Sequence, residues 1–355
     1  MMKVAILAIT KNGKKIGRRL TEIFTDMTLY SPKKLQDSES GIIWYDNSTT
    51  QMAGELFSKY DGVVYIFSLG AVIRLISPHL KDKKSDPAVI VIDDKLNFVI
   101  SVLSGHLGGA NKLANKIAKE TGATPVITTA ADVNKTISVD LVGRDLGWAI
   151  DDDTNVTRIS AYMVNEEPIG IFQDAGDKNW WHHPLPSNVT IYDTLDGLVQ
   201  SNSKGYLIIT DRILTDSIVS SDVADKAVLY RPPSLVIGVG LHHNTTSETI
   251  QRGIIQSLKK YNFSLKCVAK IASIKKSYTI PGIQDAANML NVSLHLVERG
   301  ELAQVSIPNP SGVVKKFEGT PSVSEAAAIL VSNGNLVIEK QKFPPDLTVA
   351  VAKIP

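Results

Sequence analysis

Short apolar, β-rich runs alternate with amphipathic helical stretches along this chain, and this alternation restricts the fold more than any other feature. An opening strand, turn and helix at residues 4–24 is the usual start of a layered α/β fold. Residues 110–120 predict a later helix that Gly122 ends. Strands are predicted around that helix at residues 63–67, 88–92, 98–102 and 125–129. The sequence therefore predicts an α/β protein built from three-layer α/β/α units.

The same pattern divides the 355 residues into three parts. Residues 1–135 are predicted to form an N-terminal α/β domain, and residues 136–232 a middle module that is grouped with it. Residues 233–355 are predicted to form a separate C-terminal α/β domain, which begins after the rigid pair Pro232-Pro233. Two or three domains are what a chain of this length is expected to form.

Two helix starts in the later parts of the chain carry capping signals. The three aspartates at 151–153 precede a predicted helix, where carboxylates stabilise the first turn. Thr320 or Ser322 is predicted to cap a second helix, and Glu325 follows Ser322 at the spacing of a capping box. These residues are therefore predicted to have structural roles.

The composition is that of an ordinary soluble protein, and it argues against several functions. A net charge of +2 and an aromatic content of 6% do not favour nucleic-acid binding. No run approaches the roughly 18–20 apolar residues of a membrane span, and the opening residues predict a strand rather than a signal peptide. The single cysteine, Cys267, excludes an internal disulfide and is predicted to lie in the core. A cytoplasmic location is therefore expected.

Two glycine-containing turns follow predicted strands in the first part of the chain. The first contains Gly70, and the second opens the helix at 110–120 with the segment Ser104-Gly105-His106-Leu107-Gly108-Gly109. Glycines let the backbone approach a ligand closely, and the N–H groups at a helix start attract anions. On these grounds alone, the second turn predicts a site for carboxylates or phosphates. A tight strand–helix connection without a ligand is the alternative, and the motif is neither a Walker loop nor a dinucleotide fingerprint.

Longer blocks around these turns resemble a known family. They read LGAVIRLISPHLKDKKSDPAVIVID from Leu69, VISVLSGHLGGANKLANKIA from Val99 and PVITTAADV from Pro125. A fourth block, PNPSGVVKKFEGTPSVSEAAAIL, lies near the C-terminus. Together they resemble the CbiG proteins of anaerobic cobalamin biosynthesis, which are cobalt-precorrin-5A hydrolases. The resemblance covers most of the chain and is weakest in the middle.

The resemblance implies an enzyme that acts on a cobalt-containing tetrapyrrole. The family's reaction opens the ring-A δ-lactone of cobalt-precorrin-5A, releases the C20 two-carbon fragment as acetaldehyde and leaves cobalt-precorrin-5B. This makes the expected activity that of a hydrolase acting on a carbon–carbon bond. No cofactor and no protein-held metal are expected, because the cobalt arrives within the substrate. The tetrapyrrole and neighbouring pathway enzymes are the expected partners, with no nucleic acid and no membrane.

The histidine turn holds the predicted catalytic residues. His106 is the predicted general base, because the ordinary pKa of histidine lies near neutrality and a glycine turn leaves the ring accessible. Ser104 is a second candidate, as a nucleophile, although water is the simpler attacker. The N–H groups of Gly105, Gly108 and Gly109 are predicted to form an oxyanion hole or to hold a carboxylate. An axial bond from His106 to the substrate's cobalt, or a purely structural role, stays open.

Further residues are predicted to bind the carboxylate arms of the substrate. Arg74 is placed in the first turns of a helix at 73–80, where a cation opposes the helix dipole and so suggests a ligand. The other candidates in the first part are Gly70, Lys83, Lys84, Asn111, Thr128 and Thr129. The C-terminal domain is expected to supply another wall through Gly240, Asn309, Ser311, Gly319 and Thr320.

The C-terminal part departs from the family's pattern at two places. Residues 241–245 read LHHNT where the family resembles GCRKG, and residues 273–277 read SIKKS where it resembles SIDLK. These differences keep a second hypothesis open, in which the chain binds and carries a tetrapyrrole of the same pathway without converting it. A nucleotide- or sugar-phosphate-binding enzyme is a third interpretation, based on the anion-binding turn alone.

Overall fold

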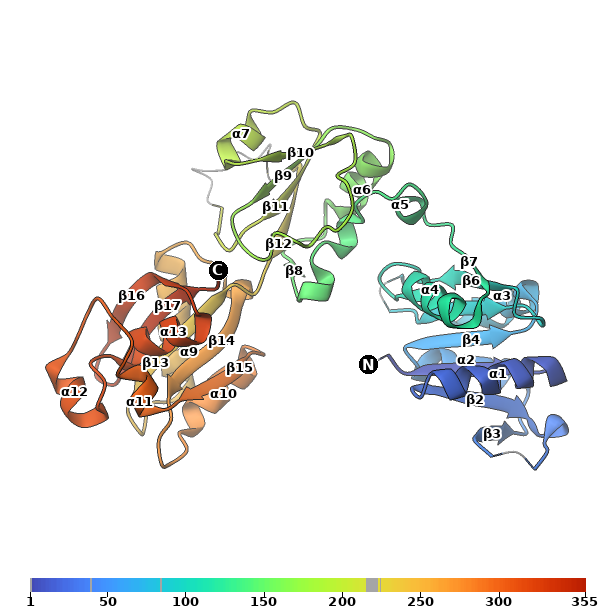
Figure 1. Cartoon of the computed structure of the whole chain (residues 1–355), viewed down its shortest axis with the longest axis horizontal. Coiled ribbons are helices and arrows are strands. Elements are labelled where there is room, and N and C mark those ends of the chain that lie inside the picture. The colour runs from blue at the N-terminus through green and yellow to red at the C-terminus, as the bar shows by residue number, and fades with distance from the viewer. Residues whose placement is uncertain (1, 39, 84, 215–222, 224) are drawn as a thin grey trace. The chain divides into compact units, whose positions relative to one another are not determined.

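A computed structural model describes residues 2–38, 40–83, 85–214, 223 and 225–355. Contacts within the chain divide it into two units, Met1–Leu141 and Val142–Pro355, which run from blue to teal and from green to red in Figure 1. The first unit contains one sheet, and the second contains two. The middle residues, which the sequence groups with the N-terminal part, thus share a unit with the C-terminal strands. The three domain ranges stay predictions.

A seven-stranded sheet forms the first unit, in the order β3-β2-β1-β4-β5-β6-β7. Its strands are β1 (Val4–Ala8), β2 (Met27–Pro32), β3 (Ile42–Tyr45), β4 (Gly62–Ile66), β5 (Ala88–Ile92), β6 (Phe98–Leu103) and β7 (Thr124–Val126). Its helices are α1 (Lys11–Ile23), α2 (Thr49–Lys59), α3 (Leu69–Ile76), α4 (Ala110–Thr121) and α5 (Ala130–Val133), with short 3₁₀ turns η1 (Lys33–Leu35), η2 (Ser77–His79) and η3 (Val139–Leu141). Residues of α1 and α4 pack on one face, and residues of α2 and α3 on the other. This is the predicted three-layer α/β/α arrangement (Figure 1).

The last two strands of this sheet run against the others. β1 to β5 are parallel, but β6 pairs antiparallel with β5, and β7 is parallel to β6. Leu103 at the end of β6 therefore lies beside Val89 at the start of β5. The loop after β6 lies near the N-terminal ends of the parallel strands β4 and β5. Gly70 follows β4 and therefore lies at the C-terminal ends of these strands. The two glycine turns are thus separated by the length of the strands.

The start of helix α3 corrects the argument for Arg74. The helix begins at Leu69 rather than at residue 73, so Arg74 lies in its last turn. A cation there is favourable, because it faces the negative end of the helix dipole. Arg74 Nη1 also donates a hydrogen bond to the carbonyl oxygen of Gly70 at 3.0 Å. The expectation that Arg74 opposes the dipole is therefore wrong, and its position has a structural explanation.

Two five-stranded sheets form the second unit, in the orders β10-β9-β11-β12-β8 and β15-β14-β13-β17-β16. The middle sheet contains β8 (Ala149–Ile150), β9 (Ile169–Gln173), β10 (Val189–Tyr192), β11 (Gly205–Ile209) and β12 (Ala227–Arg231), with α6 (Val156–Val164), α7 (Leu195–Val199) and η4 (Arg144–Leu146). The C-terminal sheet contains β13 (Leu235–Leu241), β14 (Val268–Ile274), β15 (Ser293–Val297), β16 (Asn335–Phe343) and β17 (Leu347–Lys353). Its helices are α9 (Ser247–Lys260), α10 (Pro281–Met289), α11 (Arg299–Leu302), α12 (Gly312–Glu318) and α13 (Val323–Ser332), with the turn η5 (Leu265–Cys267).

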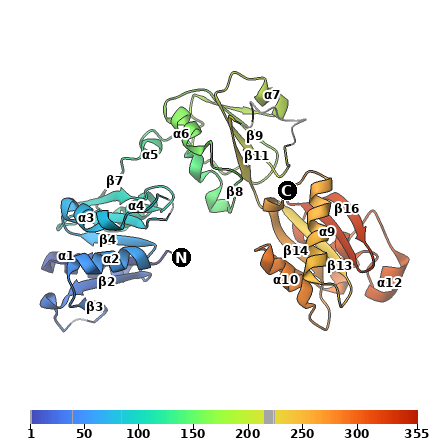
Figure 2. The ribbon, with the colours of Figure 1, turned by 180° about the vertical axis from the view of Figure 1, so that it is seen from behind.

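The C-terminal sheet is covered by helices on both faces. Side chains of α9 and α10 pack on one face, which Figure 2 presents with α9 across the strands. Residues of α13 pack on the other face. Cys267 is fully buried, as predicted, and its sulfur lies 3.7 Å from the carbonyl oxygen of Thr210 after β11. In the described part of the chain, no helix is both long and apolar enough to cross a membrane.

Neither predicted capping arrangement of the second unit forms its side-chain hydrogen bond, although Ser322 is the N-cap residue of α13 as predicted. Asn155 is the N-cap of α6, with no side-chain bond, and Asp151 instead pairs with Arg231 and Lys266 at 2.8 Å each. Burial raises the pKa of Asp151, but the bonds from Lys266 and Arg231 outweigh it, so its pKa lies below the usual range. At α13, Ser322 makes no side-chain cap bond. Asp151 thus has tertiary partners, whereas Asp152 keeps a local one and accepts from the Thr154 N–H at 2.8 Å.

Glu325 does not form the predicted capping box, and its side chain lies in the C-terminal core instead. Its side chain is fully buried, and Oε1 accepts hydrogen bonds from Asn309 Nδ2 at 2.8 Å and from the Lys340 backbone N–H at 3.2 Å. The ammonium group of Lys340 lies 3.8 Å from Oε2. Glu325 therefore connects α13 to β16 rather than to its own helix start.

Candidate active site

The loop between β6 and α4, residues 104–109, is held tightly by its own backbone. Ser104 has a φ of +55° and Gly109 a φ of +84°, which lets the chain turn from strand to helix within a few residues. A Cβ atom on Gly108 would lie 2.3 Å from the Cβ of Ser104, so only glycine fits there. The N–H groups of Ala110 and Asn111 donate to the carbonyl oxygens of Ser104 and Gly105 at 3.1 and 3.0 Å. The loop is thus a fixed platform for the side chain it carries.

His106 projects from this platform between two carboxylates. Its Nε2 lies 2.7 Å from Asp132 Oδ2, and its Nδ1 lies 3.5 Å from Asp140 Oδ1. Only 16% of the histidine side chain is exposed, against 36% for Asp132 and 22% for Asp140. Asp132 belongs to α5 and Asp140 to η3, so the segment after β7 supplies both partners. The histidine is therefore oriented through both ring nitrogens.

The side chain of Asn111 fixes the position of Asp132. Asn111 is 5% exposed, and its Nδ2 donates to Asp132 Oδ2 at 2.8 Å and to Thr129 Oγ1 at 2.9 Å. Its Oδ1 accepts from Ser101 Oγ at 2.7 Å. A buried side-chain amide that uses donors and acceptor in this way makes a rigid link between β6, α4 and α5.

The two carboxylates change the acidity of the imidazole. The hydrogen bond with Asp140 is the largest cause that raises the pKa of His106, burial opposes it, and the bond with Asp132 adds to the rise. The net result is a pKa above the ordinary value. Since a carboxylate can only accept, Asp132 requires the proton to be on Nε2, which leaves Nδ1 as the nitrogen that can gain or lose one.

The other groups of the turn have local partners. Ser104 Oγ donates to the carbonyl oxygen of Asp86 at 2.9 Å, and the N–H of Gly109 donates to the carbonyl oxygen of His106 at 3.0 Å. The N–H group of Gly109, one of the predicted oxyanion donors, is therefore already hydrogen-bonded within the loop. A Cβ on Gly105 would lie 2.7 Å from Asn111 Oδ1, so this glycine is needed for the close approach of the amide.

The structure gathers part of the predicted set and separates the rest. Thr128 follows β7 and Lys83 precedes β5, so both lie at the same ends of the strands as the histidine turn. The structure brings together Ser104, Gly105, His106, Gly108, Gly109, Asn111 and Thr129. Gly70 lies at the opposite ends of these strands. Lys84 lies outside the described residues.

The predicted residues of the C-terminal part lie in the second unit, where each has a local role. Ser311 caps α12 by accepting from the Val314 N–H at 3.4 Å, and Gly319 ends that helix with a φ of +71°. Thr320 is fully buried, with its hydroxyl 3.3 Å from the carbonyl oxygen of Leu302. The remaining two are Asn309, which donates to Glu325, and Gly240, where a Cβ would lie 2.5 Å from Thr348 Oγ1.

Asp132 and Asp140 are the residues that reasoning from the sequence missed. Asp132 belongs to the block PVITTAADV, and its place in the first turn of a short helix resembles an ordinary capping residue. Asp140 lies in a short stretch with no pattern of its own. A histidine that acts as a base is commonly oriented by a carboxylate. The carboxylates that follow the next strand could therefore have been proposed as partners of His106.

Comparison with known proteins places these residues in a family. Three family models match in order: Cobalamin synthesis G N-terminal over residues 51–132, Cobalamin biosynthesis central region over 137–232 and Cobalamin synthesis G C-terminus over 235–352. A curated protein of Priestia megaterium, "Cobalt-precorrin-5A hydrolase", is 40% identical over 99% of this chain and 95% of its own length. The chain belongs to the CbiG family. The N-terminal family model includes both His106 and Asp132.

A second curated protein and a solved structure are also similar to this chain. A protein of Salmonella typhimurium, also named "Cobalt-precorrin-5A hydrolase", is 29% identical over 95% of this chain and 93% of its own length. A solved structure from Sulfolobus solfataricus, described as a cobalamin biosynthesis protein G homolog, is 23% identical, covers 99% of this chain and 97% of that one, and has a TM-score of 0.39.

The stretches that depart from the CbiG pattern are largely exposed and make local contacts in the second unit. The ring of His243 contacts that of Tyr278, with centroids 4.8 Å apart. Lys276 Nζ lies 2.7 Å from Glu318 Oε1, and Lys275 pairs with Glu298 at 2.5 Å. Both altered stretches thus make contacts within the C-terminal part itself.

Proposed function

We propose that this chain is a cobalt-precorrin-5A hydrolase of cobalamin biosynthesis, as its relatives are named. In the proposed reaction, water adds to the carbonyl carbon of the ring-A δ-lactone and the bond from that carbon to the C20 oxygen breaks. This gives a free acetate arm and an alcohol on C20. The bond between C20 and the macrocycle then breaks, its electron pair stays on the macrocycle, and C20 leaves with its methyl group as acetaldehyde. One water is consumed, and cobalt-precorrin-5B results.

The observation that carries this proposal is His106 held between Asp132 and Asp140. Asp132, at 2.7 Å from Nε2, keeps the proton on that nitrogen and orients the ring. Nδ1 is then the base that takes a proton from the attacking water, and Asp140, 3.5 Å away, stabilises the imidazolium that forms. The N–H groups of Gly105 and Gly108 are suited to the oxyanion of the tetrahedral intermediate, whereas that of Gly109 is engaged within the loop.

The same histidine serves the second step. The C20 alcohol must lose its proton as the carbon–carbon bond breaks, and neutral His106 can take that proton once the first has been passed on. The macrocycle gains a proton in exchange, so charges balance over the whole reaction. Cobalt enters within the substrate, so the proposed reaction needs no metal ion or cofactor that is bound by the protein itself.

The pH dependence of the rate follows from the surroundings of His106. Only the neutral imidazole acts as a base, so kcat should rise with pH through a pKa above the usual value of about 6.5. Asp132→Asn removes one negative charge and should move this rising limb to lower pH by about one unit, because an opposite charge within about 4–6 Å raises the pKa of a histidine by that order. Asp140→Asn should move it in the same direction.

Profiles of kcat against pH for the unaltered chain, Asp132→Asn and Asp140→Asn check this expectation. Asp285→Asn, which removes an exposed carboxylate from α10 in the second unit, is the matched control and should leave the limb where it is. A rate that falls with rising pH through the same pKa would instead make His106 an acid, and the assignment of Nδ1 as base would be wrong.

Anaerobic incubation of the purified chain with cobalt-precorrin-5A tests the function itself. We expect acetaldehyde in the trapped vapour and a product that has gained one water and lost the two-carbon aldehyde. Tight binding with no turnover by folded protein would reject the enzyme and favour the carrier that the altered C-terminal stretches suggest. Release of the open lactone without acetaldehyde would show that only the first step occurs on this chain.

A further inference from the structure

The two most exposed large apolar side chains in the described part of the chain lie one turn apart on α12. Val313 is 68% exposed and Phe317 is 71% exposed. Residues four positions apart project from the same side of a helix, so the two side chains form one apolar strip. Figures 1 and 2 both show α12 at the margin of the C-terminal sheet, beyond its strands. Neighbouring exposed apolar side chains, unlike scattered ones, mark a surface that binds a ligand or a partner.

α12 itself is held firmly in the C-terminal part of the chain. The backbone N–H of Ser311 donates to the carbonyl oxygen of Pro321 at 2.8 Å, which closes the base of the segment that contains the helix. The Ser311 hydroxyl caps the first turn. Val314, the third apolar side chain of α12, packs against the C-terminal core. The outward position of Val313 and Phe317 is therefore a fixed feature of the fold.

The charges around this strip are predominantly positive. α12 contains Lys315 and Lys316, which are both exposed, and a single carboxylate, that of Glu318. Lys276 Nζ, from the loop after β14, lies 2.7 Å from Glu318 Oε1, and Arg299 Nη2 lies 3.8 Å from Oε2. Cations from outside the helix thus neutralise its glutamate, and the two lysines give α12 an excess of positive charge. The strip is therefore suited to an anionic ligand.

A second exposed aromatic ring lies close to α12. Tyr278 is 45% exposed, and Lys276 Nζ, the partner of Glu318, lies 5.6 Å from the centroid of its ring. The ring of His243 packs edge-on against Tyr278, with centroids 4.8 Å apart, and holds it in place. Phe317 and Tyr278 are thus both close to the Lys276–Glu318 ion pair. Because His243 and Lys276 belong to the stretches that depart from the CbiG pattern, those departures help to build this surface.

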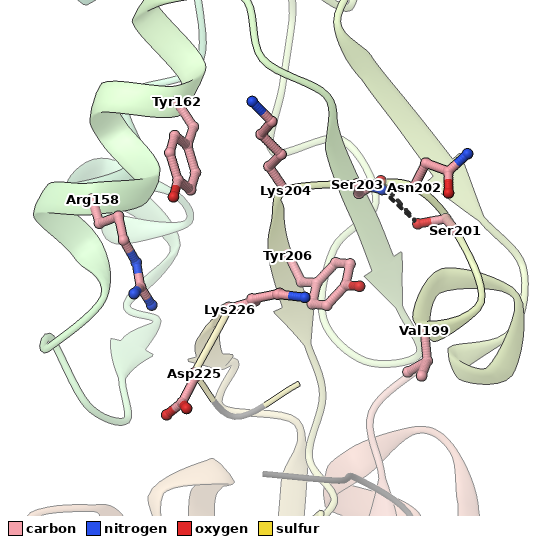
Figure 3. A pocket seen from close by; sticks show the side chains of 10 residues that line it. All are labelled: Arg158, Tyr162, Val199, Ser201, Asn202, Ser203, Lys204, Tyr206, Asp225 and Lys226. Atoms are coloured by element: carbon pink, nitrogen blue, oxygen red, sulfur yellow. Dashed lines mark hydrogen bonds between the residues drawn. The ribbon is translucent and has the colours of Figure 1, made fainter. Parts of the chain in front are cut away.

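This region is separate from the histidine turn and from a pocket in the middle sheet. The pocket, shown in Figure 3, lies between α6 and the starts of β11 and β12, and its Lys204 pairs with Glu167 at 2.8 Å. His106 belongs to the other compact unit. Neither place contains residues of α12 or of the loop after β14.

We propose that one face of a tetrapyrrole with carboxylate arms binds to the α12 surface, which comprises Val313, Lys315, Lys316, Phe317 and Tyr278. Exposed aromatic side chains with cations beside them bind flat anionic ligands by stacking, as they bind the bases of single-stranded nucleic acids. The macrocycle lies against the apolar and aromatic side chains, and its arms make charge-assisted hydrogen bonds with the lysines. The choice of a tetrapyrrole rests on the proposed function.

A second copy of the chain is a less suitable occupant of this surface. Contact between the α12 helices of two copies would bring Lys315 and Lys316 of one copy against the same lysines of the other, and like charges at an interface are costly. A lipid membrane is also less suitable, because α12 has only seven residues and exposes only two apolar side chains.

Calorimetric titration of the intact chain with uroporphyrin, a flat tetrapyrrole with carboxylate arms, tests this site. Phe317→Gln should weaken binding about tenfold, the effect of losing one stacked ring. Lys316→Gln should weaken it about threefold, and this smaller difference should disappear at high salt. Met289→Gln is the matched apolar control, because Met289 is 63% exposed at the end of α10. Lys259→Gln, in the last turn of α9, is the matched charge control, and both controls should change the affinity by less than about twofold.

The results divide into support and contradiction. Weaker binding by Phe317→Gln and Lys316→Gln, with both controls unchanged, supports the proposal. Equal effects of all four substitutions would overturn it, because they would reflect general charge and stickiness. An unaltered chain that binds no uroporphyrin would also overturn it, and acetaldehyde release by the same preparation separates this failure from a failure of the hydrolase. A dimer in sedimentation, or binding to anionic lipid vesicles, that Phe317→Gln abolishes would assign the surface to another occupant and reject the tetrapyrrole. Circular dichroism of each variant confirms that it is folded.

Discussion

Replacing His106 with alanine is expected to lower kcat for cobalt-precorrin-5A by a factor of about 10² to 10⁴, the usual contribution of a positioned general base. The imidazole is the group held at 2.7 Å from Asp132 and 3.5 Å from Asp140, and alanine supplies nothing to accept the proton of water. KM should change little, because the histidine is proposed to act on the reacting water rather than to hold the substrate's arms. Steady-state release of acetaldehyde measures both constants.

His295→Ala is the matched control for this substitution. His295 lies in β15 of the second unit, where its Nε2 is 3.2 Å from Ser293 Oγ, and its loss should leave kcat within about twofold. A His106→Ala protein that keeps its kcat but binds the substrate far more weakly would contradict the base and favour the axial cobalt contact. Unchanged kcat and unchanged KM would leave the histidine with a structural role only.

Gly238→Ala is expected to destabilise the C-terminal part of the chain by about 3 kcal/mol, at the upper end of what overpacking costs. Gly238 lies in β13, and a Cβ there would meet the carbonyl oxygen of Ser324 at 1.8 Å and the nitrogen of Ala328 at 2.8 Å. Both atoms belong to the backbone of α13, so no side-chain rotation can relieve the clash. The helix would have to move away from the sheet that it covers.

Urea unfolding followed by far-UV circular dichroism measures this effect as a lower transition midpoint. Gly300→Ala is the matched control: nothing lies within 4 Å of its added Cβ, and the residue is in the helix α11. Because alanine favours a helix over glycine, this control should be neutral or stabilising by up to about 1 kcal/mol. If Gly238→Ala unfolds at the same midpoint as the unaltered chain, the close packing of α13 on β13 is not what the structure describes.

Local patterns in the sequence were sufficient to predict most of the elements, and the reason is physical. Residues 88–92 have the strand limits that their apolar run predicts, and the helix predicted at 110–120 extends from 110 to 121. The reversed direction of β6 was missed, although the signal is present. Only five residues, 93–97, join β5 to β6, and a parallel connection needs a dozen or more. That count alone predicts a hairpin, and it would have separated Gly70 from the histidine turn.

The candidate site was only partly predictable, because its partners are set by tertiary contacts. The glycine turn and the helix after it follow from spacing, so His106 could be found. Asp140 lies 34 positions further along the chain and reaches Nδ1 only through the path taken after β7. Glu325 shows the opposite error: its spacing from Ser322 predicts a local bond, but Asn309 binds it instead. Local rules fail where a distant residue offers a better partner.

The burial of Cys267 gives this molecule a built-in reporter of its own motion. The thiolate is the form that reacts with alkylating reagents, and burial raises the pKa of this thiol to about 12. The folded chain therefore shields the sulfur and also keeps it protonated at neutral pH. Because the sulfur is fully buried in the C-terminal core and lies against the carbonyl oxygen of Thr210, a reagent can reach it only when the packing around η5 opens. The rate of alkylation therefore measures how often that packing opens.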